Sequence, residues 1–184
     1  MMSIERSPLR SVKVLAAARD QESVLANMFE LYAYDLSAAF DLHLGSDGRY
    51  GYDSLPLYWQ DETRLPFLIE VDGWLGGFAL ISRGSLLSTD CSVWDMAEFF
   101  VLKKYRRLGV GSRAVQELWR RFPGRWEVRV LNTNEPALSF WRTTIAVFTG
   151  AKPESVAVEQ GGRQRFCFSF ECLPTAPNNS REPA

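Results

Sequence analysis

The chain has 184 residues, of which 46% are hydrophobic and 23% are charged, and its formal net charge is -1. This length and composition are typical of one globular domain and exclude a disordered chain. The near-neutral charge excludes a general basic field for nucleic acid, so any bound anion must be held locally.

Apolar periodicity and turn residues predict an alternation of strands and helices along the chain. Asp72-Gly73 and Gly161-Gly162 each join two β-forming runs and predict hairpins, while Asn134 suits a helix N-cap. The predicted elements are, in chain order, a strand at 11–18, a helical region at 21–44, a turn-rich break at 45–53, a short helix or extended lip at 55–59, strands at 66–71, 74–82 and 92–101, a helix at 110–122, a strand at 126–131, a helix from 134 to about 144, and strands at 155–160 and 163–172.

This order predicts a mixed α/β layer fold in a single domain at residues 1–173. The polar, proline-rich segment 174–184 is expected to be a disordered tail. No apolar run suggests a membrane span or an export signal, so a cytoplasmic protein with no membrane partner is expected. Three cysteines without metal-ligand spacing and one histidine, His43, favour free thiols and argue against a metal site.

The segment at 96–112 carries the clearest chemical signal, because a strand leads through a basic turn and two glycines into a helix. Gly109 and Gly111 lack the Cβ atoms that would hold a ligand away from the backbone. The first amides of a helix lack intrahelical acceptors and lie at the positive end of its dipole. Four basic side chains add charge there: Lys103, Lys104, Arg106 and Arg107. A phosphate or diphosphate is the expected guest.

Three other interpretations of this segment compete with a simple anion site. The run from Gly109 to Ala114 also fits a dinucleotide-binding fingerprint, but a five-residue basic turn separates it from the strand and the alternating βαβ context is missing. A P-loop requires a Gly-Lys-Ser/Thr triplet, which the chain lacks. The two glycines alone would favour a plain tight strand-to-helix turn with solvated charges.

A second element downstream favours one family. Arg106-x-x-Gly109-x-Gly111 before a helix, followed after a strand by Asn134-Glu-Pro-Ala137-Leu-Ser-Phe140-Trp141, resembles the GNAT superfamily of N-acetyltransferases. The resemblance implies a mixed, mostly antiparallel six- to seven-stranded central sheet with helices on both faces. It also implies acetyl-CoA as the acyl-donor cosubstrate, without a metal. Family members are often dimers, although no segment here indicates an interface.

The resemblance assigns the cofactor-binding residues position by position. Backbone amides would hold the diphosphate, Phe100 and Val101 would pair through their backbones with the pantetheine arm, and Asn134 would contact the arm or cap its helix. Phe140 would pack beside the cleft, more as a core residue than as a ligand contact. The diphosphate turn comprises Arg106, Arg107, Leu108, Gly109, Val110, Gly111 and Ser112.

Acetyl transfer needs a neutral amine, and deprotonating a lysine-like amine at neutral pH costs roughly 4.6 kcal/mol. Glu98 is the candidate general base. The alternative is that Glu98 simply faces solvent from its strand and has no catalytic role. Strict alternation places Glu98 on one face with Trp94, Met96 and Phe100, and Asp95 on the other. Trp141 occupies the position where the family often has a proton-donating tyrosine, and an indole cannot serve as that acid. Tyr105 is the candidate replacement; the alternatives are that water delivers the proton or that the thiolate leaves unassisted.

The acceptor is expected to lie against the first helical region, where acidic and aromatic residues suit a small-molecule or peptide amine. Tyr32, Asp35 and Trp59 are the candidate substrate contacts; a solvated acidic face with core aromatics is the alternative. Nearby residues of the same kinds are Tyr34, Asp41, Asp47, Tyr52, Asp53 and Tyr58. The resulting hypothesis is an N-acetyltransferase; the alternatives are a non-catalytic acyl-CoA sensor, which Trp141 favours, and a nucleotide-dependent oxidoreductase.

Overall fold

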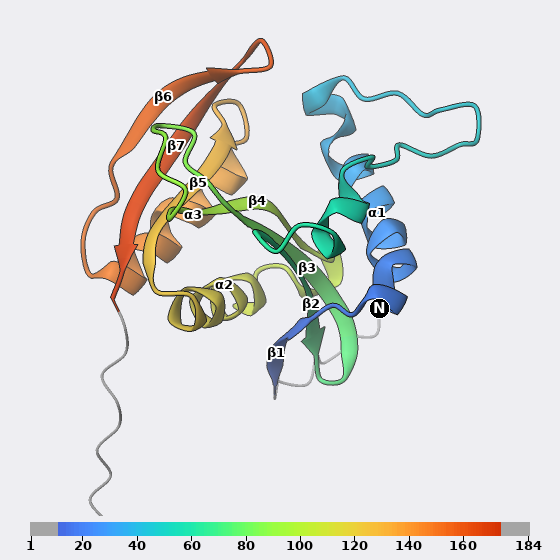
Figure 1. Cartoon of the computed structure of the whole chain (residues 1–184), viewed down its shortest axis with the longest axis horizontal. Helices are drawn as coiled ribbons and strands as arrows, with labels where there is room; N and C mark the ends of the chain where they lie inside the picture. The colour runs from blue at the N-terminus through green and yellow to red at the C-terminus, as the bar shows by residue number, and fades with distance from the viewer. Residues whose placement is uncertain (1–10, 174–184) are drawn as a thin grey trace, which may run out of the picture.

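The computed structural model describes residues 11–173, and the tail expected at 174–184 lies outside the described residues. Its helices and strands are β1 Val12–Ala16, η1 Arg19–Gln21, α1 Glu22–Phe40, η2 Leu55–Trp59, β2 Arg64–Val71, β3 Trp74–Arg83, β4 Trp94–Val101, η3 Lys103–Tyr105, α2 Val110–Arg121, β5 Gly124–Leu131, α3 Glu135–Thr149, β6 Ser155–Gln160 and β7 Arg163–Cys172 (Figure 1).

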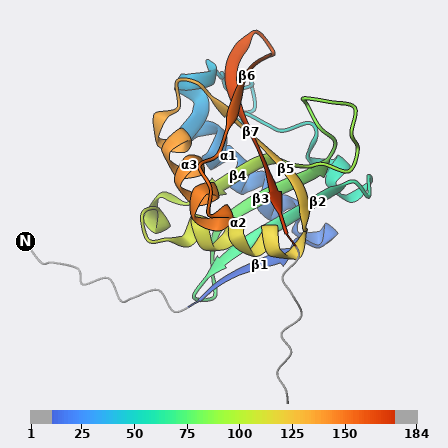
Figure 2. The ribbon, with the colours of Figure 1, turned by 90° about the vertical axis from the view of Figure 1, so that its left-hand side faces the viewer.

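The described strands form one seven-stranded sheet in the order β1-β2-β3-β4-β5-β7-β6. Neighbouring strands are antiparallel except β4 and β5, which are parallel because α2 forms the crossover between them. Helix α1 lies on one face of the sheet, and α2 and α3 lie on the other (Figures 1 and 2). The prediction of a mostly antiparallel mixed sheet with helices on both faces is therefore confirmed.

Both predicted hairpins are present, and their turns use the expected residues. Asp72 and Gly73 have φ angles of 51° and 83° between paired Val71 and Trp74, as a two-residue turn with two left-handed positions requires. Gly161 and Gly162, at 58° and 70°, join β6 to β7 in the same way. Local turn chemistry was sufficient to place these strands.

Two helix ends differ from the prediction. Helix α1 ends at Phe40 rather than near residue 44, because Asp41 adopts a left-handed conformation with a φ of 49°. Helix α3 continues to Thr149, five residues beyond the predicted end, and Gly150 then terminates it with a φ of 71°. At its start the Asn134 side chain accepts a hydrogen bond from the Ala137 amide at 3.2 Å, so the predicted N-cap is present.

Strand β4 departs from strict alternation, and this corrects the predicted facing of its side chains. Leu80 pairs with Glu98 but Ile81 pairs with Met96, so Ala97 is an extra residue in a β-bulge. Trp94 and Met96 pack with α2 and α3, whereas Phe100 packs beneath α1. Asp95 and Glu98 consequently share the face toward α1, and the expectation that they face opposite ways was wrong.

The described part of the chain has neither a membrane-spanning helix nor a cluster of metal ligands. None of its helices combines the length and apolar character needed to cross a membrane. Across residues 11–173, His, Cys, Asp and Glu side chains do not gather in groups of three or more that could hold a metal ion. Cys91, Cys167 and Cys172 are free thiols, the first exposed and the other two buried.

Candidate active site

A cleft opens where β4 and β5 diverge. The two parallel strands pair only from Trp94 opposite Trp126 to Met96 opposite Val128, so the rest of β4 has no partner strand on that side within residues 11–173. The bulge at Ala97 adds to this divergence, because bulges bend and twist a strand. A cavity of about 120 Å³ lies between the strands and reaches α1 and α3. Its lining includes Tyr32, Leu36, Phe40, Ala97, Phe99, Arg129, Asn134 and Trp141.

The ladder between β3 and β4 determines which backbone groups of β4 face the cleft. The Leu102 amide donates to the Gly76 carbonyl at 2.8 Å. In an antiparallel pair, every second residue points its backbone N–H and C=O groups toward the same neighbouring strand. The Phe100 carbonyl therefore lies against β3, only 2.1 Å from where a Cβ on Gly77 would stand. Phe99 and Val101 turn their backbones toward the cleft. The Phe100 backbone is thus turned away from the role expected of it, and Phe99 becomes the candidate in its place. The sequence prediction missed Phe99 because it assumed no register.

The turn between η3 and α2 presents a run of amides without protein acceptors. The first helical bond of α2 runs from the Arg113 amide to the Gly109 carbonyl at 3.1 Å. Among the described residues, the amides of 107–112 donate no hydrogen bond of good geometry to a protein acceptor. Arg107 and Gly109 have φ angles of 61° and 78°. Alternating left-handed residues turn successive amides toward one side, a geometry that binds anions. A non-glycine residue in this conformation costs about 1 kcal/mol, which the rest of the turn must offset.

The basic side chains of this turn divide into two groups. Arg106 forms an ion pair with Asp35 of α1, and its Nε donates to the Val101 carbonyl at 2.7 Å. Arg106 therefore fastens α1 to the end of β4, and Asp35, expected to contact the acceptor, is engaged in the same pair. Lys103 and Arg107 are exposed and have no ion pair within the described residues. Their charge is available to an anion at the turn.

Glycine at position 111 allows α2 to pack closely against α3. A Cβ there would stand 3.1 Å from the ring of Phe140 and 3.6 Å from that of Phe99. These two rings are stacked with centroids 5.9 Å apart and an interplanar angle of 9°. Ser112 lies 3.1 Å from Thr144 through their hydroxyl oxygens and joins the same two helices. The small residue thus lets the amide turn sit directly against the wall of the cleft.

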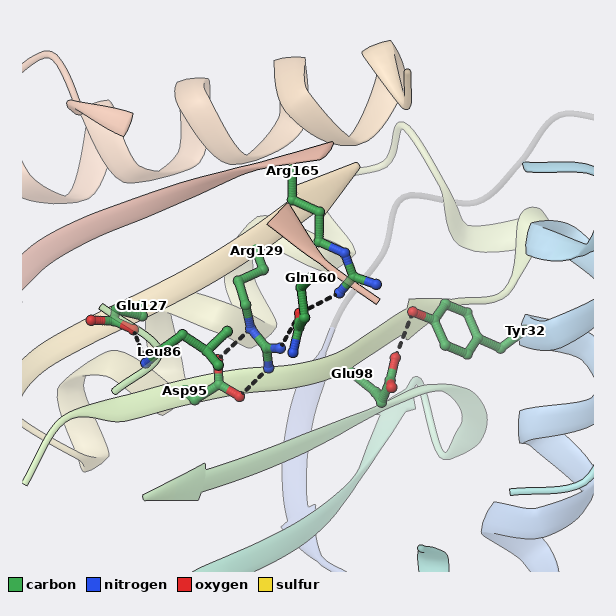
Figure 3. A network of polar contacts seen from close by, with 8 residues as sticks. All are labelled: Tyr32, Leu86, Asp95, Glu98, Glu127, Arg129, Gln160 and Arg165. Carbon is green, nitrogen blue, oxygen red and sulfur yellow. Dashed lines mark hydrogen bonds and ion pairs between the residues drawn. The ribbon is translucent and has the colours of Figure 1, made fainter. Parts of the chain in front are cut away.

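The bulge brings Glu98 beneath α1, where Tyr32 donates a hydrogen bond to its carboxylate at 2.7 Å (Figure 3). Burial raises the pKa of the Glu98 carboxyl, and the hydrogen bond from Tyr32 acts in the opposite direction. Burial and the nearby Glu98 carboxylate raise the pKa of the Tyr32 hydroxyl well above its ordinary value. A carboxylate with a raised pKa next to a protonated hydroxyl is a candidate pair for proton exchange.

A charged network continues from Glu98 across the same face of the sheet (Figure 3). Asp95 and Arg129 form a two-bond ion pair, with Nε to Oδ1 at 3.1 Å and a second nitrogen to Oδ2 at 2.5 Å. Arg129 and Arg165 both donate to the side-chain oxygen of Gln160, at 3.0 and 2.8 Å. No local sequence signal indicated this network, because its members come from β4, β5, β6 and β7.

We expect Asp95→Asn to lower the free energy of unfolding by about 2 kcal/mol, because asparagine leaves the Arg129 charge uncompensated in a largely buried position. Chemical denaturation at neutral pH measures this change. Asp20→Asn, at an exposed position of η1, serves as the matched control and is expected to change stability by less than about 0.5 kcal/mol. Equal stability of the two variants would show that the Asp95–Arg129 pair does not support the fold.

Two aromatic residues, Tyr105 and Trp59, occupy places that the sequence did not predict, whereas Trp141 lies at the cleft as expected. Tyr105 is buried in the core cluster beneath α2 and does not line the cleft, so Tyr32 replaces it as the candidate proton donor. Trp141 lines the cleft and makes an edge contact with Phe99. Trp59 donates its indole N–H to the Ala17 carbonyl at 2.9 Å, which ties η2 to the end of β1. Trp59 is therefore a packing residue in this structure rather than an open substrate contact.

A larger cavity of about 550 Å³ lies beneath the loop that follows α1. Glu30 on α1 holds this loop by accepting hydrogen bonds from the amides of Tyr50 and Gly51, at 2.8 and 3.0 Å. Tyr52 stacks on Phe29 with ring centroids 4.3 Å apart. Asp47 and Asp53, expected on the acceptor side, are among its lining residues. The loop thus forms a wall beside α1, on the face of the sheet that also bears Glu98.

Comparison with known proteins agrees with this architecture. The model of the acetyltransferase (GNAT) family matches residues 28–144, more than half of the chain. An acetyltransferase from Thermus thermophilus superposes with a TM-score of 0.65 at 14% identity, covering 90% of this chain and 99% of its own. The ribosomal-protein-S18-alanine N-acetyltransferase from Escherichia coli gives 0.56 at 12% identity, with coverages of 91% and 98%.

A PaiA N-acetyltransferase from Thermoplasma acidophilum, solved in complex with coenzyme A, gives a TM-score of 0.58 at 10% identity. The superposition covers 88% of this chain and 99% of the other. No curated protein matches the sequence at a significant level. At these identities the likeness to solved structures concerns the fold, and the family match concerns the central part of the chain.

Proposed function

The chain belongs to the GNAT family of acetyltransferases, and from this premise we propose that it transfers an acetyl group from acetyl-CoA to a primary amine in a ternary complex. The observation that carries the proposal is the run of unpartnered amides at 107–112 beside the unpaired edge of β4. A diphosphate fits the amides, and an extended pantetheine arm fits the backbone groups of Phe99 and Val101. The arm then leads into the cleft toward the bulge and Glu98.

Glu98 is proposed as the general base. The ammonium form of a lysine-like amine must lose a proton before it can attack, at a cost of roughly 4.6 kcal/mol at neutral pH. Glu98 accepts this proton, the amine nitrogen forms a bond to the thioester carbonyl carbon, and the carbon–sulfur bond breaks. The raised pKa of Glu98, caused chiefly by burial, brings the base closer to the working pH.

Tyr32 is proposed to deliver the proton that the departing thiolate needs. It lines the cleft, and its hydroxyl shares a hydrogen bond with Glu98. Tyr32 can give its proton to the sulfur and recover one from the protonated Glu98. One of the two protons that the ammonium nitrogen loses therefore ends on the thiol, and the other is released to solvent. This relay does not need an acid at Trp141, whose indole cannot act as one.

The proposed function is tested by incubating the protein with acetyl-CoA and a panel of primary amines. We expect thiol release to depend on both substrates, initial-rate plots to intersect as in a sequential mechanism, and mass spectra to show acetylated amine. Binding of acetyl-CoA without acetylation of any amine would contradict the proposal and favour a non-catalytic acyl-CoA sensor.

Replacing Tyr32 with phenylalanine is expected to move the acidic limb of the pH–rate profile to higher pH. In the wild type, the hydrogen bond from Tyr32 lowers the pKa of Glu98. Without this bond the pKa of Glu98 is higher, so the base stays protonated to a higher pH. We expect kcat/KM to fall about tenfold on the acidic limb. Tyr34→Phe on the same helix, at a side chain that is 70% exposed, is the control; identical profiles for both variants would remove Tyr32 from the mechanism.

A further inference from the structure

Arg165, at the start of β7, is a cation beside the proposed general base. Its guanidinium points from β7 toward the Tyr32–Glu98 pair (Figure 3). Within the described residues no carboxylate lies at ion-pair distance from it, and its hydrogen bond goes to the neutral oxygen of Gln160 at 2.8 Å. Its Nε is buried and has no hydrogen-bond partner among those residues. A buried donor without an acceptor costs about 1–3 kcal/mol, so such a group calls for a ligand or another reason.

The neighbouring arginines differ from Arg165 in this respect. Arg129 is neutralised by the two-bond pair with Asp95. Arg163 donates to the carbonyls of Ala39 and Phe40 at 2.9 and 2.7 Å, at the negative end of α1. Burial and the nearby Arg129 guanidinium lower the pKa of Arg165, the direction expected for a cation that lacks its own counter-charge. Glu98 acts on it only from longer range.

We propose that Arg165 forms an anion subsite for the acceptor, so that the preferred amine also carries a carboxylate, as an amino acid does. The inference rests on the proposed function, because it takes the amine to be held at Glu98. One end of such an acceptor presents nitrogen to Glu98, and the other accepts hydrogen bonds from the unpartnered nitrogens of Arg165. The arginine fork matches a carboxylate with two parallel hydrogen bonds.

This acceptor class differs from the cationic amine that the acidic residues of the first helical region suggested. Asp35 is paired with Arg106, and Tyr32 is bonded to Glu98, so neither is open to recognise a second positive charge. In the part of the chain that the structure describes, the cation left without a counter-charge beside Glu98 is on β7. Specificity then arises because an acceptor without an anionic group leaves the Arg165 donors unsatisfied.

The test compares α-, β- and γ-amino acids with the corresponding amines that lack the carboxylate, using acetyl-CoA as donor. For at least one pair we expect wild-type kcat/KM to favour the amino acid by about tenfold or more. Arg165→Gln is expected to reduce that ratio to about one, mainly by raising KM for the amino acid. The amino acid and its matching amine depend on the same base. The ratio of their kcat/KM values therefore cancels any effect of Arg165 on Glu98.

Arg142→Gln is the matched control, since Arg142 is an exposed arginine on α3 whose guanidinium lies 5.9 Å from the ring centroid of Phe166, much as that of Arg165 lies 5.7 Å from the ring centroid of Phe40. It is expected to keep the wild-type preference, and Arg165→Lys to keep part of it. Equal use of both members of every pair by the wild type would overturn the anion subsite while leaving the acetyltransferase intact. An unchanged preference of Arg165→Gln for the amino acid would likewise overturn the anion subsite and leave the acetyltransferase proposal standing. Acetylation of no amine at all would overturn the proposed function and this inference with it.

Discussion

Glu98→Gln is expected to lower kcat/KM for amine acetylation at least about a hundredfold near neutral pH, and by less as the pH rises toward the pKa of the amine. Glutamine keeps the shape of the side chain and can still accept the hydrogen bond from Tyr32, but it cannot take a proton. At low pH nearly all of the amine is protonated, so the base matters most. At high pH the amine arrives neutral and the variant should approach the wild type. Profiles from roughly pH 6 to 10 measure the difference.

The stability of Glu98→Gln shows whether the loss of activity comes from the missing base or from unfolding. Because burial raises the pKa of Glu98, its contribution to stability is fully present below the unfolded-state value and is lost as the pH rises through the folded-state value. Glu98→Gln should therefore be no less stable than the wild type at neutral pH. Glu171→Gln, at an exposed position on β7, should keep full activity. A parallel pH–rate profile in Glu98→Gln, reduced by a constant factor, would exclude Glu98 as the base.

Gly109→Asp is expected to weaken acetyl-CoA binding about a hundredfold, whereas Gly109→Asn should weaken it less than about tenfold. Gly109 is the N-cap of α2 with a φ of 78°, and a Cβ there would meet no atom within 4 Å. Asparagine and aspartate tolerate this backbone conformation at similar cost, so the pair isolates the added charge. The aspartate carboxylate repels the diphosphate and competes for the same amides. Calorimetric titration measures both affinities.

A truncated donor locates the effect of Gly109→Asp. S-acetylpantetheine has the thioester and the arm but no diphosphate, so its kcat/KM should change less than about twofold in the variant. Equal loss with both donors would show that the substitution disturbs the cleft rather than the anion site. Gly111 is unsuitable for this test, because any side chain there would press on Phe140 and change the packing of α2 against α3.

Local signals predicted much of the fold. Asp72-Gly73 and Gly161-Gly162 identified the hairpins because their left-handed conformations leave few alternatives. Asn134 identified the start of α3 by the same kind of local chemistry. The bulge at Ala97 was not predictable, because the run from Trp94 to Val101 satisfies a regular strand equally well. That one residue decides which side chains of β4 face α1, and hence the surroundings of Glu98.

The candidate site was predicted only where it is contiguous in sequence. The amide turn at 107–112 was found because a helix start, two glycines and basic residues adjoin. Arg106 and Asp35 are 71 residues apart, and Tyr32 and Glu98 are 66 apart. Such pairings depend on how α1 crosses the sheet, which periodicity does not reveal. The sequence therefore predicted Arg106 as a phosphate ligand and Asp35 as an acceptor ligand, although the two are each other's partners.

A crystal structure of the protein with coenzyme A would show directly where the diphosphate binds. We expect diphosphate oxygens within about 3.2 Å of several amide nitrogens of residues 107–112, with the pantetheine arm along Phe99 and Val101 and its sulfur in the cleft near Glu98. A diphosphate held elsewhere, with those amides facing only water, would contradict this expectation.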